Sequence, residues 1–252
     1  MKYITLICFA MISFISCTQK NNTLEERKEK INEAESISLT ADQTERRNKS
    51  IDYCKKHSIP TIEHLPCIES EAEVKIRNQD EVIGRVFALC YLGLKSEGLE
   101  KKHLNEFDQK YGASAYFTET EKGYAFTELP TEQQTADANW RYESLHVLLW
   151  SLGYIDSLRY PGELCNVAED VKTIFSRSKE QFIGQAKLRS KKEILDQADL
   201  IYRINWACVN ARTKNEEPAS GLNASVVYER HYALNWLINY MDQAWDDVST
   251  DT

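Results

Sequence analysis

The chain of 252 residues is poor in residues that break helices: it has nine glycines and five prolines. Sandwiches and barrels of β-strands need many turn residues, so this scarcity favours helices. Hydrophobic residues (42%) and charged residues (28%) occur in the proportions usual for a globular domain. We therefore predict a mainly α fold, a single bundle-like helical domain with at most one small β-hairpin.

Positive charge is also scarce. Lys and Arg number 31 against 39 Asp and Glu, which gives a formal net charge of −8 at pH 7. A nucleic-acid-binding protein needs a basic surface to neutralise phosphates. The composition therefore argues against a nucleic-acid partner.

A long hydrophobic run is missing from the N-terminus. The stretch "ITLICFAMISFIS" spans 13 residues, whereas a transmembrane helix needs about 20. It follows Lys2 and ends at Cys17 in "FISC", which resembles the lipobox of bacterial lipoprotein precursors. We predict a lipoprotein signal peptide over residues 1–16 and acylation of Cys17, palmitate included. A plain secretory signal or a buried N-terminal helix is the alternative.

This prediction divides the chain into three parts. After the signal peptide, residues 17–39 would be the lipidated cysteine and a polar tether, because their apolar positions are too sparse to bury a face. Residues 40–252 would form the helical domain. The expected location is the cell envelope, lipid-anchored to a bacterial membrane on the periplasmic side or at the outer membrane. The lipid would be the only contact with the membrane.

Cysteine spacing gives little chemistry. Apart from Cys8 and Cys17, the chain has Cys54, Cys67, Cys90, Cys165 and Cys208. None has the C-x-x-C spacing of a zinc or redox site. Cys54 and Cys67 could pair across a short loop in an oxidising compartment or remain free thiols.

Hydrophobic periodicity indicates where the helices lie. Thr40 and Gln43 fit a capping box, which predicts a helix to about Lys56, then an extended connector over 57–69. Further helices are predicted within 78–98, 170–177, 190–214 and 223–241, and residues 131–155 are predicted to form one long helix or two in tandem. A solvated acidic tail that Trp245 anchors follows the last helix. The aromatic segments 114–120 and 123–129 suggest a small hairpin or a loop.

Three of these helices are apolar nearly all round, yet each carries an arginine with an acid. Buried charges are costly unless they are paired and hydrogen-bonded. They must therefore form a network that fixes helix register or line a polar cleft for a ligand. The candidate polar cluster is Arg141, Glu143, Asp199, Arg203, Glu229, Arg230 and His231.

Sharper catalytic motifs are missing. Glu143-x-x-His146 has the spacing of a di-iron helix, and a di-iron site needs a second such motif and two further glutamates. On the last two long helices, however, "YERHY" places Glu229 and His231 two residues apart, and "EILD" has Asp196 where the histidine should stand. No G-x-S-x-G, glycine-rich phosphate loop or cysteine next to a histidine occurs. We predict no cofactor and no metal, and we assign no catalytic residue.

Several segments resemble the bacterial family called domain of unknown function 4272. They include "WRYESLHVLLWSLGYIDSLRYPGELCNV", "AKLRSKKEILDQADLIYRINWACVNAR" and "VVYERHYALNWLINY". The resemblance runs from about Arg46 to the C-terminus and implies a single, mostly helical domain. The family has no established activity, so it implies no catalytic residue. Many relatives resemble cytoplasmic proteins without a signal, whereas this chain has a lipobox.

Two functions remain open at the level of sequence. The first is a membrane-anchored lipoprotein that displays a helical binding or interaction domain to a protein partner. The second is an enzyme or small-molecule receptor in which Glu143 or Glu229 acts as acid or base and the arginines hold an anionic group. A pocket where carboxylates and an arginine of the cluster converge would favour the second. An immunity-like partner of a toxin also suits an acidic envelope domain, but no motif supports it.

Overall fold

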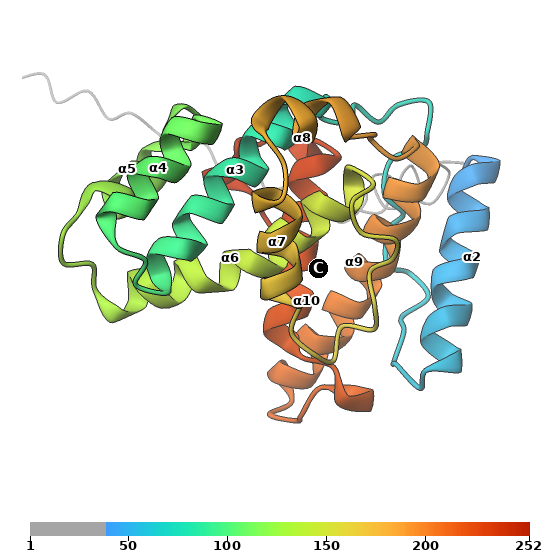
Figure 1. Cartoon of the computed structure of the whole chain (residues 1–252). Helices are drawn as coiled ribbons and strands as arrows, with labels where there is room; N and C mark the ends of the chain where they lie inside the picture. The colour runs from blue at the N-terminus through green and yellow to red at the C-terminus, as the bar shows by residue number, and fades with distance from the viewer. Residues whose placement is uncertain (1–38) are drawn as a thin grey trace, which may run out of the picture. The chain divides into compact units, whose positions relative to one another are not determined.

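The computed structural model describes residues 39–252, and over this range the chain is helical, without strands (Figure 1). The prediction of a mainly α, single helical domain is confirmed. The predicted signal peptide, Cys17 and nearly all of the tether lie outside the described residues. The helices are α2 (Ala41–Lys56), α3 (Gln79–Ser96), α4 (Lys101–Tyr111), α5 (Glu119–Phe126), α6 (Glu132–Ser151), α7 (Val167–Phe175), α8 (Lys179–Gln185), α9 (Lys191–Thr213) and α10 (Ala224–Leu237).

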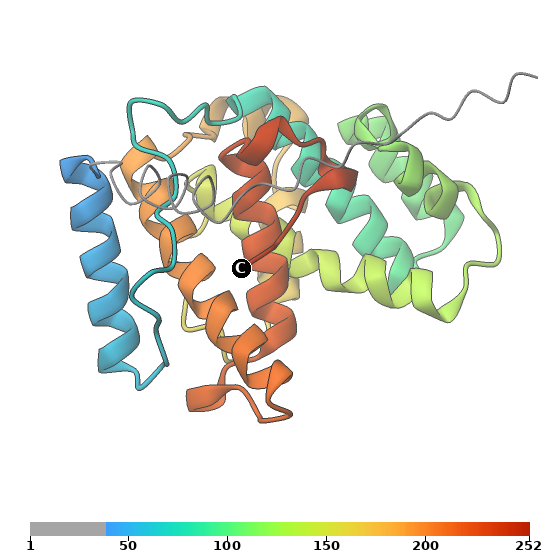
Figure 2. The same cartoon turned by 180° about the vertical axis from the view of Figure 1, so that it is seen from behind.

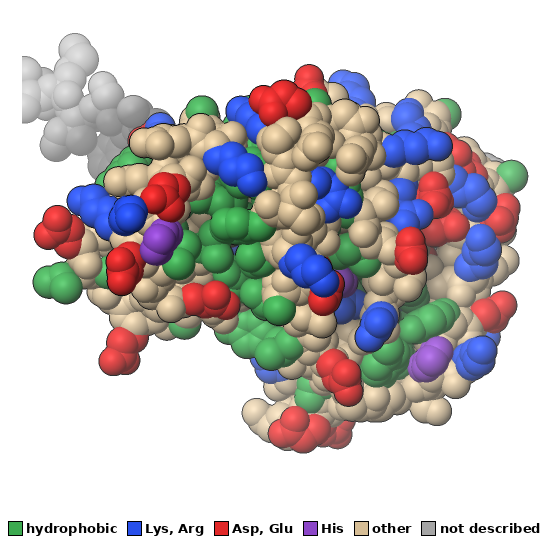
Figure 3. Space-filling model, in the orientation of Figure 1, with side chains coloured by type: hydrophobic (Ala, Val, Ile, Leu, Met, Phe, Trp, Pro, Cys, Tyr) green, Lys and Arg blue, Asp and Glu red, His purple; other side chains and the backbone are tan. Residues whose placement is uncertain are grey.

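Four 3-10 helices join or follow them: Ala113–Tyr116, Ala219–Gly221, Tyr240–Asp242 and Trp245–Asp247. Among the described residues, no helix has the length and hydrophobicity needed to cross a bilayer. On the face shown in Figure 3, acidic and basic side chains are intermingled around patches of apolar side chains.

The helices pack in a chain of neighbours. α3 packs against α6, α6 against α10, α10 against α9, and α9 against α2. Figures 1 and 2 show α6 leading from the part that holds α3, α4 and α5 to the part that holds α9 and α10. Every residue of α3 from Val82 to Leu94 is buried. Helix α6 therefore contacts both α3 and α10, and the polar side chains described below lie where it faces α10.

The predicted hairpin over 114–129 is wrong, and so is the alternative of a loop. Helix α5 occupies this segment because Thr118 caps it: its side chain accepts a hydrogen bond from the Glu121 amide, and Glu121 accepts one from the Thr118 amide. The Glu121 carboxylate also lies 2.5 Å from Arg85 of α3. Tyr124 is buried on the same helix. These contacts stabilise a helix where the aromatic pattern alone suggested strands.

The predicted N-terminal helix and connector are confirmed. Thr40 and Gln43 form the capping box of α2, which ends at Lys56, and residues 57–69 contain no regular secondary structure. Arg46 is buried between α2 and α9, where it lies 2.8 Å from Asp42 and 3.7 Å from Asp196. The connector returns over α2, and Arg46 donates a hydrogen bond to its Glu69 carbonyl. Cys54 and Cys67, which could have paired, are free thiols.

The C-terminal tail is anchored as predicted, because Trp245 is buried. The tail is less solvated than the sequence suggested. Two asparagines hold its backbone: Asn235 of α10 donates to the Ser249 carbonyl at 2.8 Å, and Asn205 of α9 donates to the Thr250 carbonyl at 3.1 Å. Buried amide donors need partners, so the tail supplies what the α9–α10 interface lacks.

Candidate functional site

The predicted cluster is buried except for Arg141, whose side chain is 24% exposed, and its charge pairs form between helices as well as within one. Arg141 of α6 lies 3.1 Å from the Glu229 carboxylate of α10. The Ser144 hydroxyl donates to the same carboxylate at 2.7 Å, and the Arg141 guanidinium stacks 4.2 Å from the ring centre of Tyr232. Burial raises the pKa of Glu229, although Arg141 and Ser144 act to lower it. Glu229 is therefore a carboxylate whose charge is only partly compensated.

A second pair lies between the same two helices with poorer geometry. Arg230 Nε and Glu143 Oε2 are 3.8 Å apart, and neither atom has a hydrogen-bond partner among the described residues. The other Glu143 oxygen accepts the amide of Cys165 at 2.6 Å, and Arg230 donates to the Arg159 carbonyl at 2.6 Å. Glu143 and Arg230 thus fix the loop between α6 and α7 while leaving polar atoms unsatisfied.

The remaining members of the cluster lie elsewhere. Asp199 and Arg203 pair within α9 through two hydrogen bonds of 2.9 Å, and both are buried. His231 is buried, its Nδ1 has no partner among the described residues, and burial lowers its pKa to about 4. The structure therefore brings together Arg141, Glu229, Glu143 and Arg230 at the α6–α10 interface and leaves Asp199–Arg203 as a separate pair on α9.

The Arg141–Glu229 pair borders a cavity of about 370 Å³ between α5, α6, α10 and the Trp245 segment. Four carboxylates face it with one arginine, and three aromatic rings complete the wall. Its lining includes Glu121, Asp137, Glu229, Asp246, Arg141, Tyr124, Tyr228 and Trp245. Only Arg141 and Glu229 of this lining belong to the cluster predicted from the sequence.

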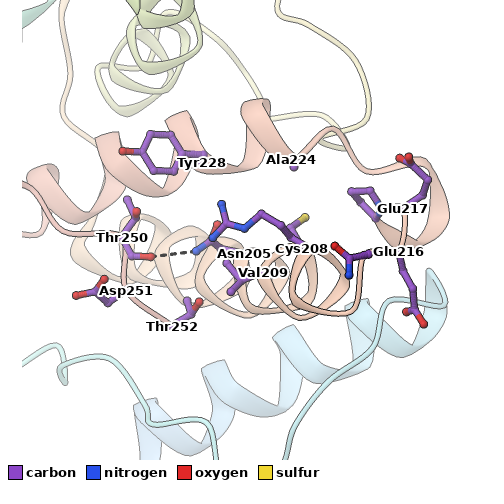
Figure 4. A pocket seen from close by; sticks show the side chains of 13 residues that line it. Asn205, Cys208, Val209, Glu216, Glu217, Ala224, Tyr228, Thr250, Asp251 and Thr252 are labelled. Carbon is purple, nitrogen blue, oxygen red and sulfur yellow. Dashed lines mark hydrogen bonds between the residues drawn. The ribbon is translucent and has the colours of Figure 1, made fainter.

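A second, larger cavity of about 780 Å³ lies between α9, α10 and the C-terminal residues (Figure 4). The hydrogen bond between Asn205 and Thr250 closes one side of it. Glu216 and Glu217 stand at the opposite end, and Tyr228 projects from α10. Its wall therefore carries the carboxylates of Glu216, Glu217 and Asp251 among apolar and uncharged polar side chains.

A third cavity of about 290 Å³ has lining residues in common with both. It shares Arg212 with the second cavity and Asp137 with the first, and Tyr228 lines all three. We name the three adjoining cavities along α10 the α10 groove. Seven acidic side chains and two arginines line it. The acidic residues are Glu121, Asp137, Glu216, Glu217, Glu229, Asp246 and Asp251.

A further polar group, which the sequence analysis did not assemble, lies on the α7 side of α6. His146 Nδ1 is 2.9 Å from the Asp170 carboxylate, and the Cys165 sulfur completes a set in which one ligand atom from each residue lies within 4.8 Å of the others. The residue types are those of a cysteine protease triad. However, burial and the nearby Glu143 and Asp170 carboxylates raise the pKa of the Cys165 thiol. A nucleophilic cysteine needs the opposite shift.

Comparison with protein families identifies the family of this chain. Residues 46–248 match the family described as Domain of unknown function (DUF4272). The chain belongs to this family. No curated protein and no solved structure matches the sequence.

The DUF4272 domain thus runs from within α2 to the segment that follows Trp245. It contains the charge pairs, most of the α10 groove and the His146–Cys165–Asp170 group. The sequence held one signal for the last of these. Glu143-x-x-His146 placed two ligand types on one face of α6, but the partners Cys165 and Asp170 flank the N-cap of α7, Asn166. Only the packing of α7 against α6 brings them to that face.

Proposed function

We propose that this chain is a lipid-anchored binding protein of the cell envelope, and that its helical domain takes a positively charged segment of a partner protein into the α10 groove. The observation that carries the proposal is the excess of acidic side chains in a groove that extends along α10. Electrostatic complementarity of this kind selects partners and speeds association. The anchor rests on the lipobox around Cys17.

The acidic side chains differ in their availability. Glu121 and Glu229 are already paired with Arg85 and Arg141. Asp137 and Asp246 lie at the exposed rim, and no basic side chain lies within 4.0 Å of either among the described residues. Carboxylates without a cation are the ones that a ligand's lysine or arginine side chains can pair with.

Aromatic side chains support the same ligand chemistry. Tyr228 lines all three cavities and is 44% exposed, and Trp140 lines the middle one. Cations bind well over the faces of such rings, by about 0.5–1 kcal/mol at exposed sites. Arg141 already stacks on Tyr232 in this way inside the domain. A basic, extended segment could use carboxylates and rings alternately along the groove.

The alternative is an enzyme or small-molecule receptor that uses the Arg141–Glu229 pair. It is favoured by the raised pKa of Glu229, a buried carboxylate at the edge of a cavity. In that function Arg141 would hold an anionic group and Glu229 would transfer a proton. The acidic lining disfavours a small anionic ligand, so we place this function second.

The test uses the full-length chain purified in detergent and fluorescence anisotropy of labelled peptides. A lysine- and arginine-rich peptide should bind, a glutamate-rich peptide of equal length should not, and binding should weaken with salt. The double variant Asp137→Asn/Asp246→Asn should weaken binding roughly tenfold, since each rim charge contributes up to about 1 kcal/mol. Asp247→Asn is the matched control, because Asp247 is exposed next to Asp246 without lining the groove.

Equal binding of both peptides, or equal affinity of the double variant and the Asp247→Asn control, would reject the groove as the binding site. Binding of small organic anions that is lost in Arg141→Met would instead favour the alternative function.

A further inference from the structure

We infer that His146, Cys165 and Asp170 form a binding site for a thiophilic divalent transition-metal ion such as Zn²⁺. The site is distinct from the α10 groove and shares no residue with its lining. Imidazole nitrogen, thiolate sulfur and carboxylate oxygen are the three ligand types that proteins use for zinc. Magnesium and calcium prefer sites built of oxygen alone, so the donor set points to a transition metal.

The three ligands come from three segments that packing fixes in place. His146 lies on α6, Asp170 lies in the first turn of α7, and Cys165 lies in the loop just before α7. The Cys165 amide donates to Glu143, and its carbonyl accepts the Val167 amide at 3.1 Å. Hydrogen bonds to both the amide and the carbonyl of Cys165 therefore fix the backbone that carries the thiol.

The distances between the three ligand atoms are close to those around a bound ion. One ligand atom from each residue lies within 4.8 Å of the others, and His146 Nδ1 and Asp170 are already 2.9 Å apart. Zinc bonds of about 2.0–2.3 Å place tetrahedral ligand atoms about 3.3–3.8 Å apart. The Cys165 side chain is half-buried. Binding of an ion therefore requires the ligand atoms of His146 and Asp170 to move slightly apart and the Cys165 sulfur to approach them.

A second, independent observation is the orphaned carboxylate oxygen of Glu143. The side chain is 3% exposed, and Oε2 has no hydrogen-bond partner among the described residues. Its other oxygen is hydrogen-bonded to the amide of Cys165, so the carboxylate borders the site. Buried polar atoms are almost always satisfied, and an ion or its water ligand would satisfy this one. Glu143 then serves as the fourth ligand or as an acceptor for metal-bound water.

The charges balance when the ion is present. Zn²⁺ and Arg230 supply three positive charges; the Cys165 thiolate, Asp170 and Glu143 supply three negative charges. His146 binds the ion as a neutral imidazole, and the proton lost by Cys165 goes to solvent. Arg230 Nε lies 3.8 Å from Glu143 Oε2, so it is placed to compensate the outer carboxylate. The occupied site would then carry no net charge, which limits the cost of burying its charged groups.

The experiment measures metal binding by the full-length chain in detergent after treatment with a chelator. Competition with a chromogenic zinc indicator should give one tight zinc per chain. Co²⁺ should give an intense cysteinate-to-cobalt charge-transfer band in the near ultraviolet. Cys165→Ser should remove the band, and Cys165→Ser, His146→Gln and Asp170→Asn should each weaken zinc binding by more than about 100-fold. Loss of an outer-shell group alone costs about 10–100-fold, the effect expected for Glu143→Gln.

Matched controls are Cys67→Ser, which removes another half-buried free thiol, and His103→Gln, which breaks the exposed His103–Glu106 pair. Both should bind metal as the unchanged chain does. Circular dichroism of the metal-free variants checks that each one folds. A measurement without variants gives an independent result: zinc should slow alkylation of Cys165 and leave Cys67 unaffected, as mass spectrometry of the labelled peptides would report.

Absence of the cobalt charge-transfer band, or equal alkylation of Cys165 with and without zinc, would overturn the proposal. The same holds if the His146→Gln variant binds zinc as tightly as His103→Gln. In those cases His146 and Asp170 form a hydrogen-bonded pair that fixes α7 on α6, with Cys165 as a neighbouring thiol.

Discussion

Arg203 and Asp199 stand four residues apart on α9 and join through two parallel hydrogen bonds of 2.9 Å. Their side chains are 2% and 1% exposed. The paired geometry satisfies both charges, which would each be costly to bury alone. Since neither residue lines the cavities described above, the pair stabilises the packing of α9.

We expect Arg203→Met to lower the free energy of unfolding by about 3–5 kcal/mol, because it leaves the Asp199 carboxylate buried without a partner. The double variant Arg203→Met/Asp199→Leu should recover most of this loss. Urea denaturation of the single and the double variant measures both effects. Arg212→Met, at an exposed position of the same helix, is the control and should change stability by less than about 0.5 kcal/mol. If Arg203→Met proves as stable as Arg212→Met, the Asp199–Arg203 pair does not stabilise the packing of α9.

The crossing of α3 and α6 depends on Gly93. A Cβ atom at this position would lie 2.4 Å from the buried ring of Tyr142. Although alanine favours helix, we expect Gly93→Ala to lower the free energy of unfolding by about 1–3 kcal/mol through overpacking. Gly123→Ala, where a Cβ meets open space in α5, should raise it by up to about 1 kcal/mol. Thermal melts of the two variants measure both changes in stability. If Gly93→Ala gains stability as Gly123→Ala does, the close contact between Gly93 and Tyr142 does not limit the packing of α3 against α6.

His231 should make the domain sensitive to mild acid. Burial lowers its pKa from 6.5 to about 4, against a weak opposing effect of Asp251. The unfolded chain therefore takes up a proton at a higher pH than the folded one. The contribution to stability is complete above pH 6.5 and falls by about 3 kcal/mol as the pH drops towards 4.

The variant His231→Gln should lack this component, so the difference between its stability and that of the unchanged chain should vary with pH over that window. Urea denaturation at a series of pH values measures it, with the exposed His103→Gln variant as the control. A constant difference between pH 4 and 7 would mean that His231 takes up its proton equally in both states.

Cys17 lies outside the described residues, and its lipidation is a prediction from the lipobox alone. Expressed in a bacterium, the full-length chain should be found in the membrane fraction and should incorporate an alkyne-tagged palmitate. Cys17→Ser should lose both properties, whereas Cys54→Ser should keep them. Label retained by Cys17→Ser would refute the anchor, though not the groove.

Local sequence patterns were sufficient for most of the helices. Hydrophobic periodicity and the Thr40 capping box placed α2, α3, α6, α7, α9 and α10. The short helices α4 and α8 were missed. In α4 only Leu104, Phe107 and Tyr111 are buried, a narrow apolar stripe in a charged segment. Helix α5 was missed because aromatic residues favour strands as well, and the contact between Glu121 and Arg85 that helps to hold it spans 36 residues.

The sequence by itself determined that the chain is helical and that an unusual set of charges must be buried. Both conclusions depend on local properties: the spacing of apolar residues along each helix, and the presence of charged residue types on helices that are otherwise apolar. Only the tertiary structure decided which charges meet. Arg141 reaches Glu229 across 88 residues, and His146 reaches Asp170 across 24. Such pairings depend on the crossing of α6 with α10 and α7. Helix crossings are set by the fit of side chains from distant segments, as Tyr142 of α6 fits against Gly93 of α3, and no single window of sequence contains both sides of such a fit.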